Sequence, residues 1–274
     1  MTSWAPITDW DDAYANRAHV PDAPRIIETW GPDATAFRAA LGERARIAVP
    51  YGPGPRQTMD IFLPERPPKG LIVFIHGGYW YLFDKTYWSH FAAGALAHGF
   101  AVAIPEYPLS PQARIPEITA SIGRAIAQLA KEFDGPIRVT GHSAGGHLAA
   151  RMICDTSPLP VDLRRRIDRV VPISGLFDLR PMLRLDMNAD WQLDMAEAIA
   201  ESPAFHLPDT HPVISAWVGG AERPEFLRQT ALLANIWIGC GARISEHIDD
   251  GKHHFDIIDG LKDPDHPLTR ALTQ

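Results

Sequence analysis

The sequence has 274 residues, of which 46% are hydrophobic and 22% are charged, and its formal net charge is −7 at pH 7. This length and composition suit one large α/β domain that buries a full core. The negative charge, without a cluster of Lys and Arg, argues against a nucleic-acid partner, because phosphate binding needs concentrated positive charge.

The N-terminus, the apolar runs and the cysteines indicate the cellular compartment of the protein. The N-terminus has neither the basic nor the apolar stretch of a signal peptide, and no later apolar run has membrane-spanning length. Cys154 and Cys240 lie far apart in the sequence, and we interpret both as small buried residues in a reducing compartment. We therefore expect a cytoplasmic protein that binds no membrane and acts on a small molecule.

Residues 1–43 mix aromatic residues with prolines and acids. Helices are predicted around Asp9–Arg17 and around Asp33–Leu41, the second opened by a capping signal at Pro32-Asp33. We interpret residues 1–43 as an N-terminal arm that packs over the domain, and a place near the mouth of a functional site is one option for it.

The chain from residue 44 onward alternates between strand and helix patterns. Strand-like runs are Arg44–Val49, Gln57–Leu63, Gly70–Ile75, Phe100–Ile104, Ile137–Thr140, Arg169–Ile173, Pro212–Val218 and Ala242–Ile248. Helical runs are Ser89–Ala97, Ile115–Phe133, a run after residue 143 to about Cys154, Pro224–Ile236, and His254–Ala271 with an interruption around Pro264. The first two strands resemble an antiparallel edge hairpin, and the alternation that follows predicts a largely parallel sheet with helices on both faces.

The segment from about residue 177 to residue 207 is richer in methionine than the rest. It predicts a small helical lid or insertion with a ligand-facing surface, and plain core packing is an equally good interpretation of its methionine and tryptophan. Apart from this insertion and the arm, residues 1–274 are expected to form a single domain.

A strand, a sharp turn and a helix meet at Gly141-His142-Ser143-Ala144-Gly145. The pattern G-x-S-x-G between a strand and a helix is the nucleophile elbow of α/β-hydrolases, in which two glycines let the chain turn tightly under an exposed serine. The alternative is a glycine-rich turn that holds a phosphate at the helix N-terminus, but the Walker lysine and the dinucleotide spacing are absent. Ser143 is thus the candidate nucleophile.

The loop after the Gly70–Ile75 run holds candidate oxyanion donors. Gly77 and Gly78 can turn their amides inward without side-chain obstruction, and the amide of Ala144 follows the nucleophile directly. His76 is interpreted as a residue that fixes this loop by a hydrogen bond. Tyr79 and Trp80 come next and are candidate aromatic walls for a flat substrate, with core packing as the alternative.

The general base is expected after the last strand, where His253 and His254 are adjacent. We favour His254, because the apolar residues after it would seat the helix that holds it. Glu222, after the penultimate strand, is the favoured acid, since a carboxylate must reach imidazole Nδ1 to hold its tautomer. Asp178 is the reserve candidate, and Asp249 and Asp250 also lie near the histidine in sequence.

The chain holds 12 histidines, but none shows H-E-x-x-H or Cys/His ligand spacing. We therefore expect no metal and no cofactor.

Several segments together resemble one known family. The loop His76-Gly77-Gly78-Tyr79-Trp80 resembles the H-G-G-x-W motif of the serine-hydrolase kynurenine formamidases, or arylformamidases. Val218-Gly219 with Pro224–Gln229 is similar to that family's V-G-x-x-D-x-P-E-F-x-R-Q segment, and His254–Ile258 to its H-F-[DE]-I run. With the elbow, the resemblance spans about residues 70–262, while the arm matches only loosely.

The resemblance implies an α/β-hydrolase fold and hydrolysis of N-formyl-L-kynurenine to formate and L-kynurenine, a step of tryptophan breakdown, without a cofactor. It also implies Ser143 as nucleophile, His254 as base, and Glu222 at the place where the family usually has aspartate. This departure leaves open another substrate, and a carboxylesterase or thioesterase with the same triad is the alternative. A catalytically silent fold is disfavoured because all three residue types are present in order, and a homodimer stays open.

Overall fold

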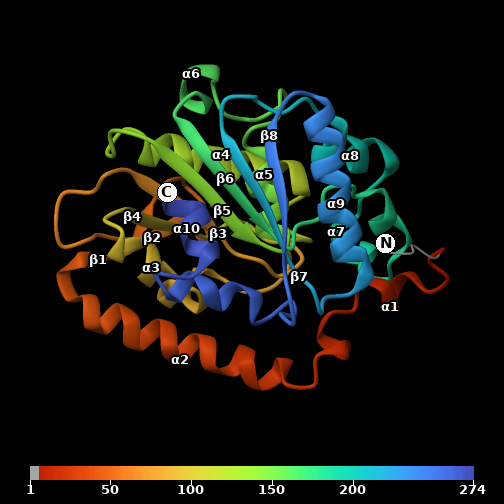
Figure 1. The fold of residues 1–274 in the computed structure, drawn as a ribbon, viewed down its shortest axis with the longest axis horizontal. Helices are drawn as coiled ribbons and strands as arrows, with labels where there is room; N and C mark the ends of the chain where they lie inside the picture. The colour runs from red at the N-terminus through yellow and green to blue at the C-terminus, as the bar shows by residue number, and fades with distance from the viewer. Residues whose placement is uncertain (1–5) are drawn as a thin grey trace.

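The computed structural model describes residues 6–274, and within them eight strands form one sheet in the order β1-β2-β4-β3-β5-β6-β7-β8 (Figure 1). The strands are β1 Ala45–Pro50, β2 Thr58–Phe62, β3 Leu71–Ile75, β4 Ala101–Pro105, β5 Ile137–His142, β6 Ile167–Ile173, β7 Val213–Gly219 and β8 Arg243–Asp249. β1 pairs antiparallel with β2, β2 pairs antiparallel with β4, and the remaining pairings are parallel. The predicted edge hairpin and largely parallel sheet are confirmed.

Helices lie on both faces of this sheet (Figure 1). They are α1 Trp10–Tyr14, α2 Ala23–Leu41, α3 Ala93–Ala97, α4 Ile115–Leu129, α5 Ala144–Arg151, α6 Val161–Arg164, α7 Asn188–Trp191, α8 Met195–Ala200, α9 Pro224–Gly239 and α10 Pro267–Thr273. The interrupted C-terminal helix of the sequence is a 3₁₀ helix, Ile257–Lys262, followed by α10. The chain has the α/β-hydrolase fold, as the sequence predicts.

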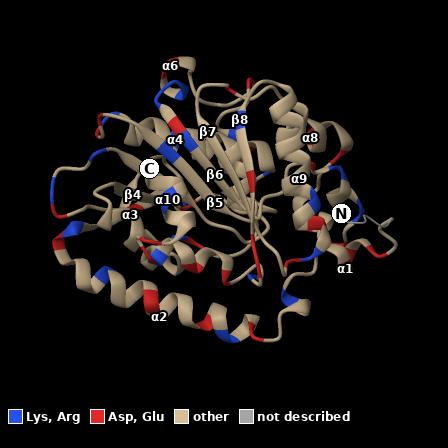
Figure 2. Cartoon of the chain, in the orientation of Figure 1, with Lys and Arg blue, Asp and Glu red and all other residues tan. Residues whose placement is uncertain are grey.

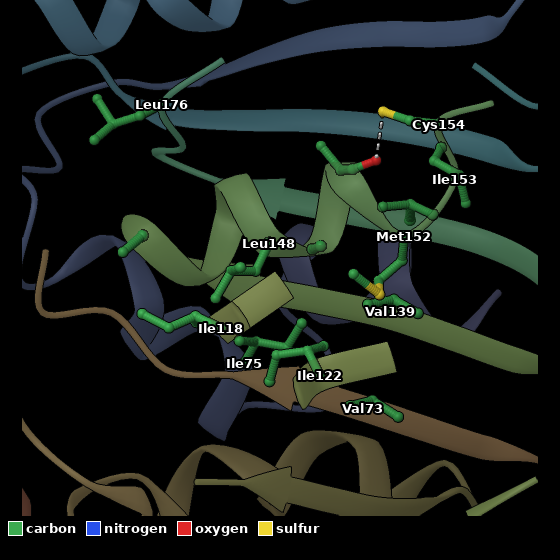
Figure 3. Close-up of a cluster of buried hydrophobic side chains, with 14 of the residues drawn as sticks. Val73, Ile75, Ile118, Ile122, Val139, Leu148, Met152, Ile153, Cys154 and Leu176 are labelled. Carbon is green, nitrogen blue, oxygen red and sulfur yellow. Dashed lines mark hydrogen bonds between the residues drawn. The ribbon is translucent and has the colours of Figure 1, made fainter. Parts of the chain in front are cut away.

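The apolar run of β3 is buried on both faces of the sheet, which explains why it does not alternate with polar residues. Val73 and Ile75 join a core cluster with α4 and α5, of which Figure 3 shows a part. Ile72 and Phe74 point to the other face and pack in a second cluster that includes residues of α2 and α10. The central strands are thus held on both sides, and this fixes the sheet edge at which they end.

The long helix α2 corrects one prediction. It begins at Ala23, so Pro32 lies inside the helix and does not open it. Proline removes one helical hydrogen bond, but tertiary packing offsets that loss. Trp30, two residues earlier, is buried with its ring centroid 4.8 Å from that of Trp88.

The segment 177–207 is helical as predicted, with 3₁₀ helices at Arg180–Arg184 and Pro203–Phe205 on either side of α7 and α8. Met182 and Trp191 are fully buried in the first core cluster. For these two residues the core-packing interpretation is the correct one.

The cysteines behave differently from one another. Cys154 is buried and its thiol donates to the carbonyl of Ala150 (Figure 3), and burial raises its pKa to about 12. Cys240 is exposed just after α9, so the expectation that both are buried is wrong for Cys240. The surface position follows from the end of α9, where the chain turns back toward β8.

Basic and acidic residues are interspersed along α2 and around the rims of the fold, as Figure 2 shows. Within residues 6–274, no helix is both long and apolar enough to span a membrane.

Candidate active site

The predicted elbow is present between β5 and α5. Ser143 has φ +56° and ψ −118°, a conformation that residues other than glycine rarely adopt, and its N–H donates to the carbonyl of Ile173 on β6 at 2.8 Å. A glycine is required two residues before Ser143 and two residues after it. A Cβ on Gly145 would lie 1.9 Å from the carbonyl oxygen of Ile75, and one on Gly141 would lie 2.3 Å from that of Gly145. The turn therefore places Ser143 at the carboxyl edge of the sheet.

An acid and a base meet at the same edge. Glu222 follows β7, His254 follows β8, and the Nδ1 of His254 lies 2.6 Å from Oε2 of Glu222. Both residues are buried, at 7% and 5% exposure. With Nδ1–H donating to the carboxylate, the Nε2 atom of His254 is left as the proton acceptor of the ring.

The alternative acid and base have other partners. His253 Nδ1 accepts from the backbone N–H groups of Phe255 and Asp256, so this ring caps the turn that follows it. Asp178 accepts from the backbone N–H and the guanidinium of Arg180. The structure therefore pairs the two residues that the sequence analysis favoured, and it gives His253 and Asp178 other partners.

His142, the residue before Ser143, connects the elbow to the histidine loop. Its Nε2 donates to the backbone carbonyl of His254 at 2.8 Å, and the two rings are 4.5 Å apart between centroids. Burial, aided by the neighbouring His254, holds the pKa of His142 well below its ordinary value. A neutral imidazole thus links β5, the strand before Ser143, to the backbone of His254.

The carboxylate of Glu222 has two further donors. Its Oε1 accepts from the Ser174 hydroxyl at 2.5 Å and from the backbone N–H of Gly219 at 2.9 Å. Ser174 is not among the site residues predicted from the sequence. A polar side chain directly after the strand next to the elbow was the signal that could have found it.

The candidate oxyanion loop lies against the elbow. A Cβ on Gly77 would lie 2.8 Å from the carbonyl oxygen of His142 and 3.1 Å from Cβ of Ser143, so only glycine fits this approach. Gly78 has φ +113°, and a Cβ there would lie 2.4 Å from the carbonyl oxygen of Leu82. Ala144 begins α5 directly after the serine. The three predicted donor residues are therefore close to Ser143 in the fold or in the chain.

His76 holds the oxyanion loop, as the sequence predicts. Its Nδ1 lies 2.8 Å from the carbonyl oxygen of Gly77, to which it donates, and its ring stacks on Tyr107 at 4.1 Å. Burial lowers the pKa of His76 to about 4, so the ring is neutral near pH 7.

The two predicted aromatic walls have different environments. Trp80 is fully buried, with its ring edge-on to Trp191 and to His147, so the prediction that it forms a substrate wall is wrong and it is a core residue. Tyr79 is partly exposed, and its hydroxyl donates to the carbonyl of Tyr14 at 2.7 Å. Tyr79 therefore remains a candidate wall, tied to the N-terminal arm.

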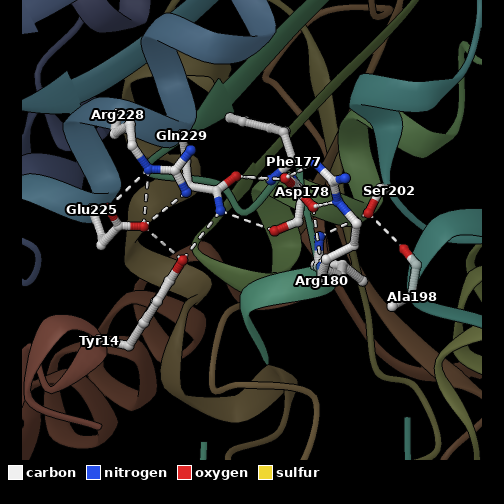
Figure 4. A network of polar contacts seen from close by, with 10 residues as sticks. Tyr14, Phe177, Asp178, Arg180, Ala198, Ser202, Glu225, Arg228 and Gln229 are labelled. Atoms are coloured by element: carbon white, nitrogen blue, oxygen red, sulfur yellow. Dashed lines mark hydrogen bonds and ion pairs between the residues drawn. The ribbon is translucent and has the colours of Figure 1, made fainter. Parts of the chain in front are cut away.

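The arm reaches the acid–base pair. A pocket of about 110 Å³ is lined by arm residues and by residues of the two loops that carry Glu222 and His254. Its lining residues are Asn16, His19, Val20, Ala221, Glu222, Arg223, Pro224 and His254. The arm is held here by Tyr14, whose hydroxyl donates to Glu225 at 2.8 Å within the polar network of Figure 4. These contacts place the arm beside the Glu222–His254 pair.

Residues 6–274 contain no group of three or more His, Cys, Asp or Glu side chains arranged to hold a metal ion.

Comparisons with known proteins find hydrolases that are similar to this chain. The family model described as BD-FAE matches residues 59–205. The chain is 26% identical to the kynurenine formamidase of Danio rerio over 278 aligned residues, which cover 98% of this chain and 91% of the relative. It is 28% identical to the kynurenine formamidase of Salmo salar, with 84% and 83% of the two chains covered.

Among solved structures, a protein of Silicibacter sp. TM1040 described provisionally as a thioesterase is 48% identical to this chain. The superposition covers 97% of this chain and 99% of that one, with a TM-score of 0.91.

Proposed function

The chain belongs to the BD-FAE family of α/β-hydrolases, and on that premise we propose that it is a serine hydrolase of the arylformamidase type, cleaving N-formyl-L-kynurenine or a closely similar aryl formamide. The observation that carries the proposal is the buried Glu222–His254 pair at 2.6 Å, on the sheet edge where the elbow places Ser143. The kynurenine formamidases that align over most of this chain support the choice of substrate.

In the first step of the proposed mechanism, Oγ of Ser143 attacks the formyl carbon while Nε2 of His254 accepts the serine proton. Glu222 holds the Nδ1–H tautomer and stabilises the imidazolium that forms. The amides of Gly77 or Gly78 and of Ala144 stabilise the oxyanion. Each well-placed donor of this kind lowers the barrier by about 3–4 kcal/mol.

In the second step, the protonated His254 donates its proton to the departing aryl amine, and the formyl group stays on Ser143 as an ester. Water then attacks this ester with His254 again as base, which releases formate and restores the serine. An aryl amine leaves more readily than an alkyl amine, so a site built like that of an esterase is adequate for this amide.

The residue at position 222 departs from the aspartate that the resemblance leads one to expect. The carboxylate nevertheless reaches Nδ1 of His254, and Gly219 has no side chain to crowd Cγ of Glu222. A Cβ on Gly219 would lie 3.2 Å from that atom. The longer acid is therefore compatible with the proposed chemistry.

The test is a side-by-side steady-state assay of the purified protein on N-formyl-L-kynurenine and on p-nitrophenyl acetate, with Ser143→Ala as control. We expect kcat/KM to be higher by orders of magnitude for the formamide, and the variant to be inactive on both substrates. Activity that survives in Ser143→Ala would contradict the serine mechanism.

The second candidate function is a carboxylesterase or thioesterase on small acyl esters with the same Ser143, His254 and Glu222. It is favoured by the 48% identity to the protein provisionally described as a thioesterase. Turnover of the ester or of an acyl thioester, with none of the formamide, would support this candidate over the first.

A further inference from the structure

Ser174 is the first residue after β6, and it is fully buried at the sheet edge between the elbow and the acid. We propose that Ser174 is a positioning residue for the reaction, which holds the carboxylate of Glu222 against His254 and makes a glutamate functional at this place. This inference rests on the proposed function, because it assigns a role in the same acid–base pair.

The contacts of Glu222 divide between its two oxygens. Oε2 faces Nδ1 of His254, while Oε1 accepts from the Ser174 hydroxyl and from the N–H of Gly219. Two donors on Oε1 fix the plane of the carboxylate, so Oε2 cannot rotate away from the imidazole. The hydroxyl of Ser174 is the one side-chain donor among them other than the base itself.

The backbone of Ser174 is fixed as tightly as that of the nucleophile. Its φ is +50°, and its N–H donates to the carbonyl of Trp217 on β7 at 2.7 Å. Ser143 has the same kind of geometry one strand earlier, with φ +56° and a bond to Ile173 on β6. A non-glycine residue with positive φ persists where its surroundings hold it, which is common at functional sites. Two such serines on adjacent strands therefore present their side chains to one catalytic edge.

The length of Glu222 explains why this serine matters. An aspartate at position 222 is one methylene shorter, so from the same backbone it cannot reach both Ser174 and His254. The glutamate reaches both, and the serine takes the second oxygen. Ser174 and Glu222 thus form a matched pair, and neither is expected to work as well without the other.

Near the Glu222–His254 pair, two titratable side chains are neutral and two are bonded to another carboxylate, so we assign the positioning role to Ser174. His142, whose ring lies 4.5 Å from that of His254, is kept neutral because burial holds its pKa far below its ordinary value. Tyr79 is also neutral, because burial raises its pKa well above the ordinary value, and the charge of Glu222 adds to this. Around the adjoining pocket, His19 and Arg223 are both bonded to Asp12.

The experiment compares wild type with Ser174→Ala and Ser174→Gly, the second of which also relieves the positive φ. Thr140→Val is the matched control. It removes a buried hydroxyl that donates to the carbonyl of Val171 and does not contact Glu222. Each protein is assayed on p-nitrophenyl acetate across pH, and its rate of labelling by a fluorophosphonate probe is measured, since both reactions need only the serine and its base.

For both Ser174 variants we expect kcat and the labelling rate to fall between about 10- and 100-fold, as for loss of a hydrogen bond to a charged group, with KM within a factor of about two. The acidic limb of kcat/KM, which reports protonation of the base, is expected to move to lower pH, because a carboxylate that is no longer held against the ring stabilises the imidazolium less. Thr140→Val is expected to match wild type in kcat, KM, labelling rate and pH profile.

A double-mutant cycle with Glu222→Asp separates positioning from general packing. Since Ser174 acts through Glu222, Ser174→Ala is expected to cost little further activity in the Glu222→Asp background. Fully multiplicative losses, or a Ser174→Ala variant with the wild-type kcat and pH profile, would overturn the role of Ser174. A wild type that neither hydrolyses the ester nor reacts with the probe would overturn the proposed function, and this inference with it.

Discussion

Two glutamates lie three residues apart at the start of α9, and both are buried, yet their surroundings differ. Glu222 is bonded to His254, a base that can gain a proton, and to the hydroxyl of Ser174. Glu225 is bonded through both of its oxygens to the guanidinium of Arg228 and also accepts from the hydroxyl of Tyr14 (Figure 4).

The difference distinguishes a carboxylate that acts in the proposed reaction, Glu222, from one that stabilises the fold, Glu225. A carboxylate beside a neutral imidazole has its charge balanced only when the ring is protonated, so its stabilisation is greatest during the reaction. A carboxylate beside a permanent cation is balanced at all times, and Glu225 raises the pKa of Arg228 further above its ordinary range through their hydrogen bond. We therefore expect Glu222 to govern activity and Glu225 to govern stability and the position of the arm.

The largest expected effect is that of Glu222→Gln on activity. The amide cannot stabilise the imidazolium, and it can favour the wrong tautomer of His254, so kcat is expected to fall by about 10⁴-fold. The unfolding temperature is expected to change little, because an oxygen acceptor for Ser174 and Gly219 is retained. Steady-state kinetics and a thermal melt of the same sample check both statements. A Glu222→Gln variant that stays active but has a lower unfolding temperature would reverse the comparison between the two glutamates.

Glu225→Gln is the matched variant on the scaffold side. It leaves Arg228 without its anion, and because that guanidinium is partly exposed, we expect the free energy of unfolding to fall by about 2 kcal/mol. Its kcat is expected to stay within about threefold of wild type. Chemical denaturation with parallel kinetics measures the two quantities. A loss of activity as large as that of Glu222→Gln would show that the two glutamates do not divide the work in this way.

Tyr14→Phe sharpens the comparison at the arm. It removes the hydroxyl that donates to Glu225 and accepts from Gln229, and we expect a loss of about 1 kcal/mol in stability. The aromatic ring still packs on Phe226, so the arm keeps its apolar contact and kcat is expected to stay within twofold. Hydrogen exchange of residues 6–20 would detect the loosened arm, and unchanged exchange would argue against Tyr14 as its anchor.

The smallest expected effect is on the free energy of unfolding, and it comes from the buried imidazole of His90. Burial lowers the pKa of His90 to about 4, and neither of its ring nitrogens has a partner within the described part of the chain. The unfolded chain binds this proton near the ordinary value of 6.5, so stability is complete above pH 6.5 and is lost as the pH falls toward 4. Between pH 7 and pH 6 we expect a loss of about 0.7 kcal/mol from this group. His90→Asn is expected to flatten that part of the profile of unfolding free energy against pH, and an unaltered slope would assign it to other groups.

Local sequence patterns predicted most of the fold. The glycines around Ser143 allow one tight turn, and the apolar run of β3 suits a strand covered on both faces, so each feature could be found from a few adjacent residues. The order of oxyanion loop, serine, acid and histidine then predicted the edge at which they meet. The start of α2 was missed because the burial of Trp30 against Trp88 depends on residues 58 positions apart, which no local capping signal contains.

Sequence alone therefore determined the fold class, the elbow and the short set of candidates for acid and base, because these depend on spacing within single segments. Only the tertiary structure decided which candidates meet. In the structure, His254 is paired with Glu222 and Asp178 is bonded to Arg180. Trp80 is buried in the core, and Ser174 donates a hydrogen bond to Glu222. Those outcomes depend on how parallel strands far apart in the chain align their ends, and on which side chains are long enough to reach across that edge.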